Sequence, residues 1–267
     1  MTLSISVLII TKNEENQMGR CLESLVWADE IIVIDGLSTD RTVEICQDLS
    51  KPWAGKVQVY PRKWTGFKDQ RNYALRQAQF DWVLVVDADE ACSPELAEKV
   101  RSLLKGPKGP DFQAYQVRRI EYLLGKPISH GMWNPSYQDR FFNKTGVSYI
   151  NEVHEYPVFN YPAGVIHEPL HHWPYLTPQK ILEKINFYTT IEAQNQYREG
   201  KRTNCFHLVA TFPAMALKTY FYYGSYKDGI HGLVVALLEG ISRLIKHIKI
   251  WQLQLEDERE KKGSSLF

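Results

Sequence analysis

The chain has 267 residues, of which 44% are hydrophobic and 24% are charged. This composition is typical of a globular protein that is long enough for one large domain and an appendage. A formal net charge of +1 gives no reason to expect a nucleic acid as a partner. The four cysteines lack metal-ligand spacing, which favours reduced thiols in the cytoplasm over a disulfide framework or a zinc site.

The first third of the chain alternates short apolar runs with segments of helical spacing. It starts directly in an apolar run, without the basic start and apolar core of a signal peptide, so we expect no export. The alternation predicts an α/β fold with a Rossmann-like, mostly parallel sheet and helices on both faces. The predicted strands span 5–10, 30–34, 56–60 and 82–86, and the predicted helices lie around 18–25, 43–49 and 70–79.

Three carboxylates follow the fourth predicted strand directly, at Asp87, Asp89 and Glu90. Ligands of parallel sheets collect at the carboxyl ends of the strands, so we expect Asp87 and Asp89 at the mouth of a site. Two ionised carboxylates at this spacing repel each other, and Mg²⁺ or Mn²⁺ would compensate them. The alternative is a solvated loop, with Asp89 or Ser93 starting the next helix.

Polar groups also follow the first two strands, in the segment Thr11–Glu14 and at Asp35. The chain has no glycine-rich dinucleotide fingerprint and no P-loop, so we expect a metal on Asp89 to hold phosphate. Thr11–Glu14 and Asp35 are then candidates for hydrogen bonds to a base or a ribose. For Asp35 the alternative is a side chain that only forms a turn.

The middle of the chain contains a helix start, a break and an irregular loop. Ser93 followed by Pro94 predicts a capped helix, and the glycines and prolines of 106–110 end it. A strand is expected at 115–120. The following loop, 125–136, is dense in Gly, Pro and aromatic residues, which is typical of a segment that faces a substrate.

Three histidines cluster later, at His167, His171 and His172. Pro169 interrupts their spacing and no cysteine accompanies them, which argues against a structural zinc. His172 is a candidate for the metal shell or for contact with a diphosphate. The alternative is a structural histidine whose hydrogen bonds are satisfied within the protein.

The character of the chain changes near residue 200, which predicts one domain over 1–200 and a helical region over 201–267. This region lacks a continuous apolar span of transmembrane length. Apolar residues mark one face of a helix over 234–251, and this amphipathic pattern predicts an element that lies in the membrane interface. The alternative is a core or oligomerisation helix. The basic residues expected to meet anionic headgroups are Arg243, Lys246, His247 and Lys249.

Several ordered motifs are similar to those of the family 2 glycosyltransferases, and together they span nearly the whole chain. Three later segments resemble the branch that contains the lipopolysaccharide core glucosyltransferases: 140–142, 153–155 and 172–189. The motifs that carry the family resemblance are Thr11–Glu14, Asp35–Thr42, Asp69–Ala74 and Asp87–Glu90.

The resemblance implies a GT-A fold, a nucleotide-sugar donor, a divalent metal and inversion of the anomeric centre. It implies a UDP-linked donor, a lipid-linked or lipopolysaccharide-core acceptor, and a peripheral place at the inner face of the plasma membrane, with a homo-oligomer possible. The metal ligand would be Asp89, with His172 as a further candidate. The donor-binding residues implied are Thr11, Asn13, Glu14, Asp35, Arg71, Asn72 and Asp87.

Transfer to a hydroxyl needs a general base that takes the acceptor proton. The candidates are Glu155, Glu152 and Asp139, and Glu155 is favoured because His154 and Glu155 match a His-Glu pair of the resembling branch. Many relatives carry the base in a Glu-Asp pair that is absent from this sequence. The alternative functions are a polyprenyl-phosphate sugar synthase and a non-catalytic, membrane-associated nucleotide-sugar-binding protein.

Overall fold

The computed structural model describes residues 3–151, 155–175 and 177–261. The chain divides into two compact units, one of Met1–Ile120 with Ser136–Trp173 and one of Glu121–Pro135 with Pro174–Phe267. This division differs from the boundary expected at residue 200. The C-terminal unit already begins after Trp173, and it also includes the segment Glu121–Pro135, which contains the end of one strand and a further short strand.

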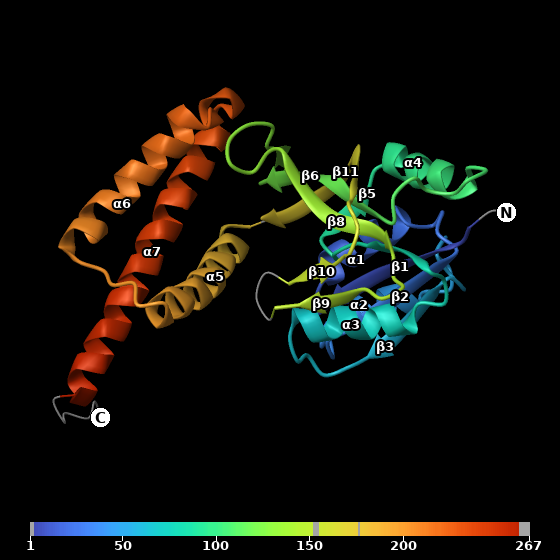
Figure 1. Ribbon diagram of the computed structural model, residues 1–267, viewed down its shortest axis with the longest axis horizontal. Coiled ribbons are helices and arrows are strands. Elements are labelled where there is room, and N and C mark those ends of the chain that lie inside the picture. Colours follow the sequence, from blue (N-terminus) through green and yellow to red (C-terminus); the bar gives the residue numbers. More distant parts are fainter. Residues whose placement is uncertain (1–2, 152–154, 176, 262–267) are drawn as a thin grey trace. The chain divides into compact units, whose positions relative to one another are not determined.

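A nine-stranded mixed sheet runs through the described residues (Figure 1). Its strands are β1 (Ile5–Thr11), β2 (Glu30–Asp35), β3 (Val57–Pro61), β4 (Trp82–Val85), β5 (Glu90–Cys92), β6 (Ala114–Leu123), β7 (Lys126–Pro127), β8 (Ser136–Asn143) and β11 (Gly164–Tyr175), while β9 (Ser148–Ile150) and β10 (Tyr156–Val158) form a separate antiparallel pair. The first four strands are parallel, in the order β3-β2-β1-β4, and confirm the predicted α/β class. The later strands pair antiparallel because no helix crosses over between β6 and β8.

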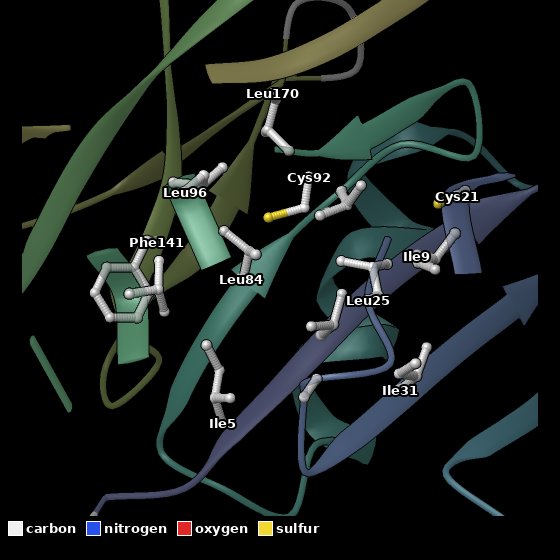
Figure 2. Packing of buried hydrophobic residues seen from close by; sticks show 14 of the residues in the cluster. Ile5, Ile9, Cys21, Leu25, Ile31, Leu84, Cys92, Leu96, Phe141 and Leu170 are labelled. Atoms are coloured by element: carbon white, nitrogen blue, oxygen red, sulfur yellow. The ribbon is translucent and has the colours of Figure 1, made fainter. Parts of the chain in front are cut away.

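The core lies on both faces of the parallel strands. On β1, Ile9 belongs to the hydrophobic cluster that Figure 2 shows, whereas Leu8 belongs to a second cluster with Ala74. A strand covered on both faces has no polar side, which is why it appears in the sequence as a continuous apolar run.

Ser93 caps the helix that starts at Pro94, as predicted, because its Oγ accepts a hydrogen bond from the Leu96 N–H at 3.1 Å. The helices of this unit are α1 (Glu15–Glu23), α2 (Thr42–Gln47), α3 (Phe67–Gln77) and α4 (Pro94–Lys105).

The second unit is built around α7 (Ile230–Lys261). Ile181 of α5 (Pro178–Arg198) and Val235 of α7 share a hydrophobic cluster with Ile128, so α5 and the 121–135 loop both belong to this unit. No helix within the described residues combines the length and the apolar character needed to cross a membrane. The other helical elements of the unit are α6 (Cys205–Leu217), a π-helical turn η1 (Lys218–Tyr222) and a 3-10 turn η2 (Ser225–Asp228).

The basic residues of α7 form ion pairs and hydrogen bonds within the second unit. This corrects the expectation that they face lipid headgroups. Lys246 is only 4% exposed, and its Nζ lies 3.4 Å from the Glu192 carboxylate of α5. The Lys249 Nζ donates hydrogen bonds to oxygens of Asn186 and to the Thr190 hydroxyl. Arg243 also pairs with Glu192, and the His247 ring pairs with Thr203. The sequence showed these charges on a helix but not the partner helix, because α5 is distant in the chain.

Candidate functional site

The carboxyl ends of β1, β2 and β4 meet at one edge of the sheet. Thr11 pairs with Asp35 in the parallel register of β1 and β2, and after β4 the Val86 N–H donates to the Leu8 carbonyl at 3.0 Å. Parallel neighbours end at the same edge, so the loops that follow them lie together, as expected from the sequence. This edge collects the polar groups of all three strand ends.

The loops after β1 and β2 are joined by hydrogen bonds. The Asn13 Oδ1 accepts from the Thr39 N–H at 2.8 Å, and the Glu14 N–H donates to the Thr42 hydroxyl at 2.8 Å. Asn13 has a φ of 57° and Leu37 has a φ of 60°, in the left-handed region that costs energy for residues other than glycine. Local strain held in place by cross-loop hydrogen bonds is typical of binding sites.

Asp35 and Thr11 are both only 2% exposed, but their hydrogen bonding differs. The Asp35 carboxylate accepts from the Ser38 N–H at 3.0 Å and from the Ser38 hydroxyl at 2.5 Å, so this side chain forms the turn after β2. The Thr11 Oγ1 is buried and has no hydrogen-bond partner among the described residues. Buried hydroxyl groups without a partner are uncommon, so the Thr11 hydroxyl is available to a water molecule or to a ligand.

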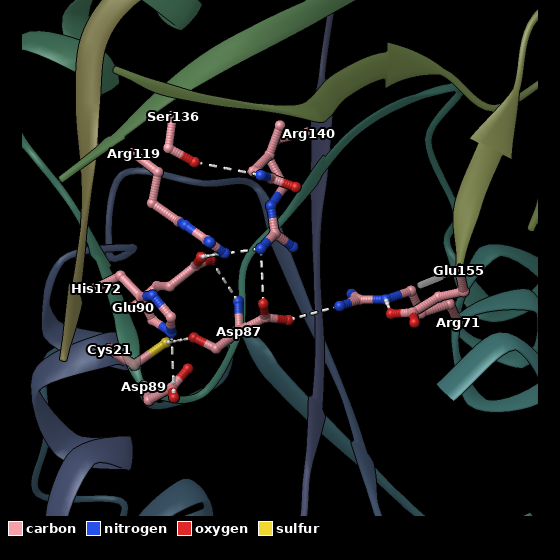
Figure 3. Close-up of polar contacts among 11 residues, drawn as sticks. Cys21, Arg71, Asp87, Asp89, Glu90, Arg119, Ser136, Arg140, Glu155 and His172 are labelled. Atoms are coloured by element: carbon pink, nitrogen blue, oxygen red, sulfur yellow. Dashed lines mark hydrogen bonds and ion pairs between the residues drawn. The ribbon is translucent and has the colours of Figure 1, made fainter. Parts of the chain in front are cut away.

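Asp87 lies between two arginines, as Figure 3 shows. Its Oδ1 accepts from the Arg71 Nη2 at 2.7 Å, and its Oδ2 accepts from the Arg140 Nη2 at 2.6 Å. Arg140 also donates to the buried Glu90 carboxylate at 2.9 Å, and the Glu90 Oε2 accepts from the Asp87 N–H at 2.9 Å. The Arg119 Nη1 lies 3.7 Å from Glu90. The negative charge of Asp87 is therefore balanced by the guanidinium groups of Arg71 and Arg140.

This network separates the pKa values of its two carboxyl groups. Burial disfavours ionisation of Asp87, but Arg140 and Arg71 outweigh burial and hold its pKa well below the ordinary value. Burial and the negative charge of Asp87 raise the pKa of Glu90, against the opposing effect of Arg140. Asp87 thus provides a permanent negative charge that orients both arginines.

Arg71 connects this network to Glu155. Its Nε donates to the Glu155 Oε1 at 2.9 Å, and its Nη1 has no hydrogen-bond partner among the described residues although it is buried. The neighbouring Asn72 has a different place, because its side-chain amide pairs with the backbone N–H and carbonyl of Tyr149, at 2.8 and 2.9 Å. Asn72 thereby holds β9 against α3.

Asp89 lies beside His172, which comes from β11. The His172 Nε2 lies 3.3 Å from the Asp89 Oδ2, and the two side chains are 11% and 15% exposed. Two backbone contacts set this geometry: His172 pairs with Glu90 in the β11–β5 register, and the Trp173 N–H donates to the Asp89 carbonyl at 2.9 Å. Chain pairing therefore places an imidazole from β11 against the second acid of the motif.

The pair of Asp89 and His172 fits a divalent cation that also takes ligands from a substrate. Mg²⁺ and Mn²⁺ use one or two carboxylates, keep several waters and bind phosphate oxygens, and Mn²⁺ also accepts imidazole. Within the described ranges no three His, Cys, Asp or Glu side chains converge on one point. A cation held by this pair would take its remaining ligands from phosphate and water.

The remaining candidates for the general base are dispersed. Glu152 and His154 lie outside the described residues. Asp139 is half-buried on β8 next to Arg140, where the register between β8 and β6 shifts by one residue. Burial raises the pKa of Asp139, and a hydrogen bond from Gln116 opposes this. Among the described candidates, Glu155 is the acid in direct contact with the site network.

Sequence reasoning gave no role to Arg140, Arg119 or Cys21, although all three surround the acidic tip. Arg140 precedes two buried phenylalanines. An arginine in such an apolar strand could have predicted a buried ion pair, because a charge buried there needs a partner. The Cys21 Sγ lies 3.6 Å from the Asp87 carbonyl. Burial, and then the nearby carboxylates, raise the pKa of Cys21 well above its ordinary value, which disfavours the thiolate form.

A mixed α/β sheet whose parallel strands end in an Asp-Ala-Asp tip beside His172 agrees with the GT-A fold expected from the sequence. A family profile described as glycosyl transferase family 2 matches residues 6–159, which is more than half of the chain. The chain belongs to glycosyltransferase family 2, as the sequence motifs predicted.

Relatives match over nearly the full length. An uncharacterized glycosyltransferase of Rickettsia typhi is 29% identical over 263 residues, covering 94% of this chain and 88% of its own length. The lipopolysaccharide core biosynthesis glycosyltransferase LpsC of Rhizobium meliloti is 29% identical over 255 residues, covering 94% of this chain and 93% of LpsC. A structure of S. aureus TarS in complex with UDP has a TM-score of 0.50 at 15% identity, covering 99% of this chain and 93% of that one. The TarS likeness confirms the fold.

Proposed function

We propose that this protein is an inverting, metal-dependent glycosyltransferase that moves a sugar from a UDP-linked donor to a lipid-linked or lipopolysaccharide-core acceptor. The observation that carries this proposal is the division of the acidic motif into two roles. Asp87 is neutralised by Arg71 and Arg140, whereas Asp89 faces His172. We infer that the second acid, beside an imidazole, shares a cation with a diphosphate.

The donor would be held by groups from all three strand ends. The unpartnered Thr11 hydroxyl, with Asn13, Glu14 and Asp35, supports binding of the base and ribose, although Asp35 must then accept from both Ser38 and the ligand. The buried Arg71 Nη1 is a further donor for the sugar or diphosphate, and Asn72 would act indirectly through β9. Asp89 and His172 would hold Mg²⁺ or Mn²⁺, which neutralises the charge of the leaving diphosphate when bound.

UDP is the first nucleotide to test because LpsC is named a glycosyltransferase and the fold neighbour TarS was solved with UDP. We expect UDP with Mn²⁺ or Mg²⁺ to raise the melting temperature, since a ligand at about 100 times its dissociation constant stabilises a fold by roughly 2.7 kcal/mol. GDP and CDP are the controls in the same thermal series. A rise in melting temperature with GDP alone would indicate a GDP-linked donor in place of a UDP-linked one. No rise with any nucleotide would contradict a nucleotide-sugar site.

Glu155 is proposed as the general base that takes the proton from the acceptor hydroxyl. We expect Glu155→Gln to lower kcat by roughly 10²- to 10⁴-fold, because proton transfer by a positioned side chain contributes about that much. The glutamine oxygen can still accept from the Arg71 Nε, so the UDP-dependent thermal shift should remain. Asp139→Asn is the matched comparison. Loss of turnover in Asp139→Asn with full turnover in Glu155→Gln would move the base to β8.

The acceptor is proposed from the name of LpsC, which points to the lipopolysaccharide core, and a peripheral place at the inner face of the plasma membrane follows from such an acceptor. A polyprenyl phosphate is the competing acceptor. Product analysis separates the two, since one product carries a glycosidic bond to a hydroxyl and the other a bond to phosphate. The same assay detects donor hydrolysis without transfer.

A further inference from the structure

The helix α6 and the turn η1 carry a continuous stripe of exposed apolar side chains. Phe206, Val209, Leu217 and Phe221 are 74%, 70%, 57% and 63% exposed. With exposed Pro213 between them, these positions follow one another at intervals of three or four residues, which places them on one side of a helix. We call Phe206, Val209, Pro213, Leu217 and Phe221 the α6 stripe.

The opposite side of α6 is the one that packs on α7. The Phe212 ring and carbonyl lie so close to Gly240 that an added Cβ there would be 2.9 Å from both. None of the described residues of α6 is fully buried. The helix is therefore attached to α7 along one side, and it presents its apolar side chains on the other.

The positive charge around the α6 stripe favours anionic lipid over a second copy of the protein as the partner. Residues 200–227 contain Lys201, Arg202, Lys218 and Lys227 and no Asp or Glu. A symmetric contact between two copies would bring two such positive segments together. Anionic lipid headgroups complement the same charge, and an apolar stripe with basic residues and tyrosines at its ends is typical of a helix that lies in the membrane interface.

We propose that the α6 stripe inserts into the headgroup region of a bilayer containing anionic phospholipid, with Lys218 and Lys227 contacting the headgroups. This proposal locates the membrane contact on a particular surface, and it rests on the membrane association given under the proposed function. It also assigns the contact to α6 and η1 in place of the basic residues of α7, which are paired with α5. Each large side chain buried in the membrane strengthens binding by roughly tenfold or more.

The test is flotation of the full-length protein with phosphatidylcholine vesicles, with and without phosphatidylglycerol. We expect the parent to float with the anionic vesicles and the double variant Phe206→Ser with Phe221→Ser to lose at least about tenfold in vesicle affinity. Lys218→Glu with Lys227→Glu should remove the preference for phosphatidylglycerol, since each basic residue near an anionic surface contributes roughly fivefold. Matched controls are Leu49→Ser and Leu182→Ser, which change apolar side chains that are 84% and 58% exposed elsewhere.

The UDP-dependent thermal shift is measured on the same samples. A variant that no longer floats but keeps the shift supports the membrane surface, because the donor site is then intact. Unchanged flotation of the double serine variant would overturn the assignment to α6. A parent that does not float, but forms a dimer that the serine variant dissociates, would overturn the lipid partner in favour of a second copy. A parent that floats without any UDP shift would instead contradict the donor site.

Discussion

Asp89→Asn is expected to abolish transfer while the protein stays folded. The substitution nearly preserves volume but removes the negative charge that faces His172. We expect kcat to fall by roughly 10²-fold or more, as for the loss of one group that stabilises transition-state charge. The effect of Mn²⁺ on the UDP-dependent thermal shift should disappear in the variant, because the cation would lose its charged protein ligand. Turnover and thermal unfolding, each with and without Mn²⁺, check both expectations.

Asp81→Asn is the matched control for this prediction. Asp81 is an exposed carboxylate just before β4, at the opposite end of the strand from Asp87 and Asp89. It should retain turnover and the dependence on Mn²⁺. Full turnover in a folded Asp89→Asn protein would refute a role for Asp89 in metal binding, and the solvated-loop interpretation of the acidic tip would then hold.

Arg140→Met is expected to cause a large loss of stability. Arg140 is almost completely buried and donates to both Asp87 and Glu90, so its removal leaves two carboxylates without their shared cation. Removing one partner from a buried ion pair costs about 3–5 kcal/mol, because the other charge stays in the interior. Denaturant unfolding at neutral pH measures the difference. Arg140→Lys should be intermediate, since an ammonium group cannot donate from a planar fork.

The loss should depend on pH in a defined direction. The pKa of Asp87 lies below its ordinary value, so its pairing stabilises the fold above about pH 4 and is lost as the pH falls through the folded-state pKa. The gap between the parent and Arg140→Met should therefore narrow in acid. Arg41→Met, in an exposed pair with Glu44, should leave stability almost unchanged at every pH. Equal losses in the two variants would contradict the buried network.

These two substitutions probe different halves of one motif. Asp89→Asn tests the carboxylate that is proposed to hold a cation, and Arg140→Met tests the ion pairs that balance the charge of Asp87. Loss of turnover with retained stability in the first, and loss of stability in the second, would support the division of roles. Similar stability losses in both would indicate that Asp89 also belongs to the structural network.

Much of the fold was predictable because its signals are local. The apolar runs at β1, β2 and β4 appear in the sequence as strands, since a strand covered on both faces must be apolar throughout. The antiparallel half of the sheet and the place of α5 were not predicted. Both depend on pairings between distant segments, such as β8 with β4 and α5 with α7, that no periodicity reveals.

By itself, the sequence determined the family, the acidic tip after β4 and the order of the polar loops, because each lies within a few consecutive residues. Only the tertiary structure decided what those groups face. Asp87 takes its partners from Arg71 and Arg140, which lie 16 and 53 positions away, and Arg71 reaches Glu155 across 84 positions. A charge in a strand shows that a partner is needed but not which one it is, because burial and pairing depend on the packing of the whole chain.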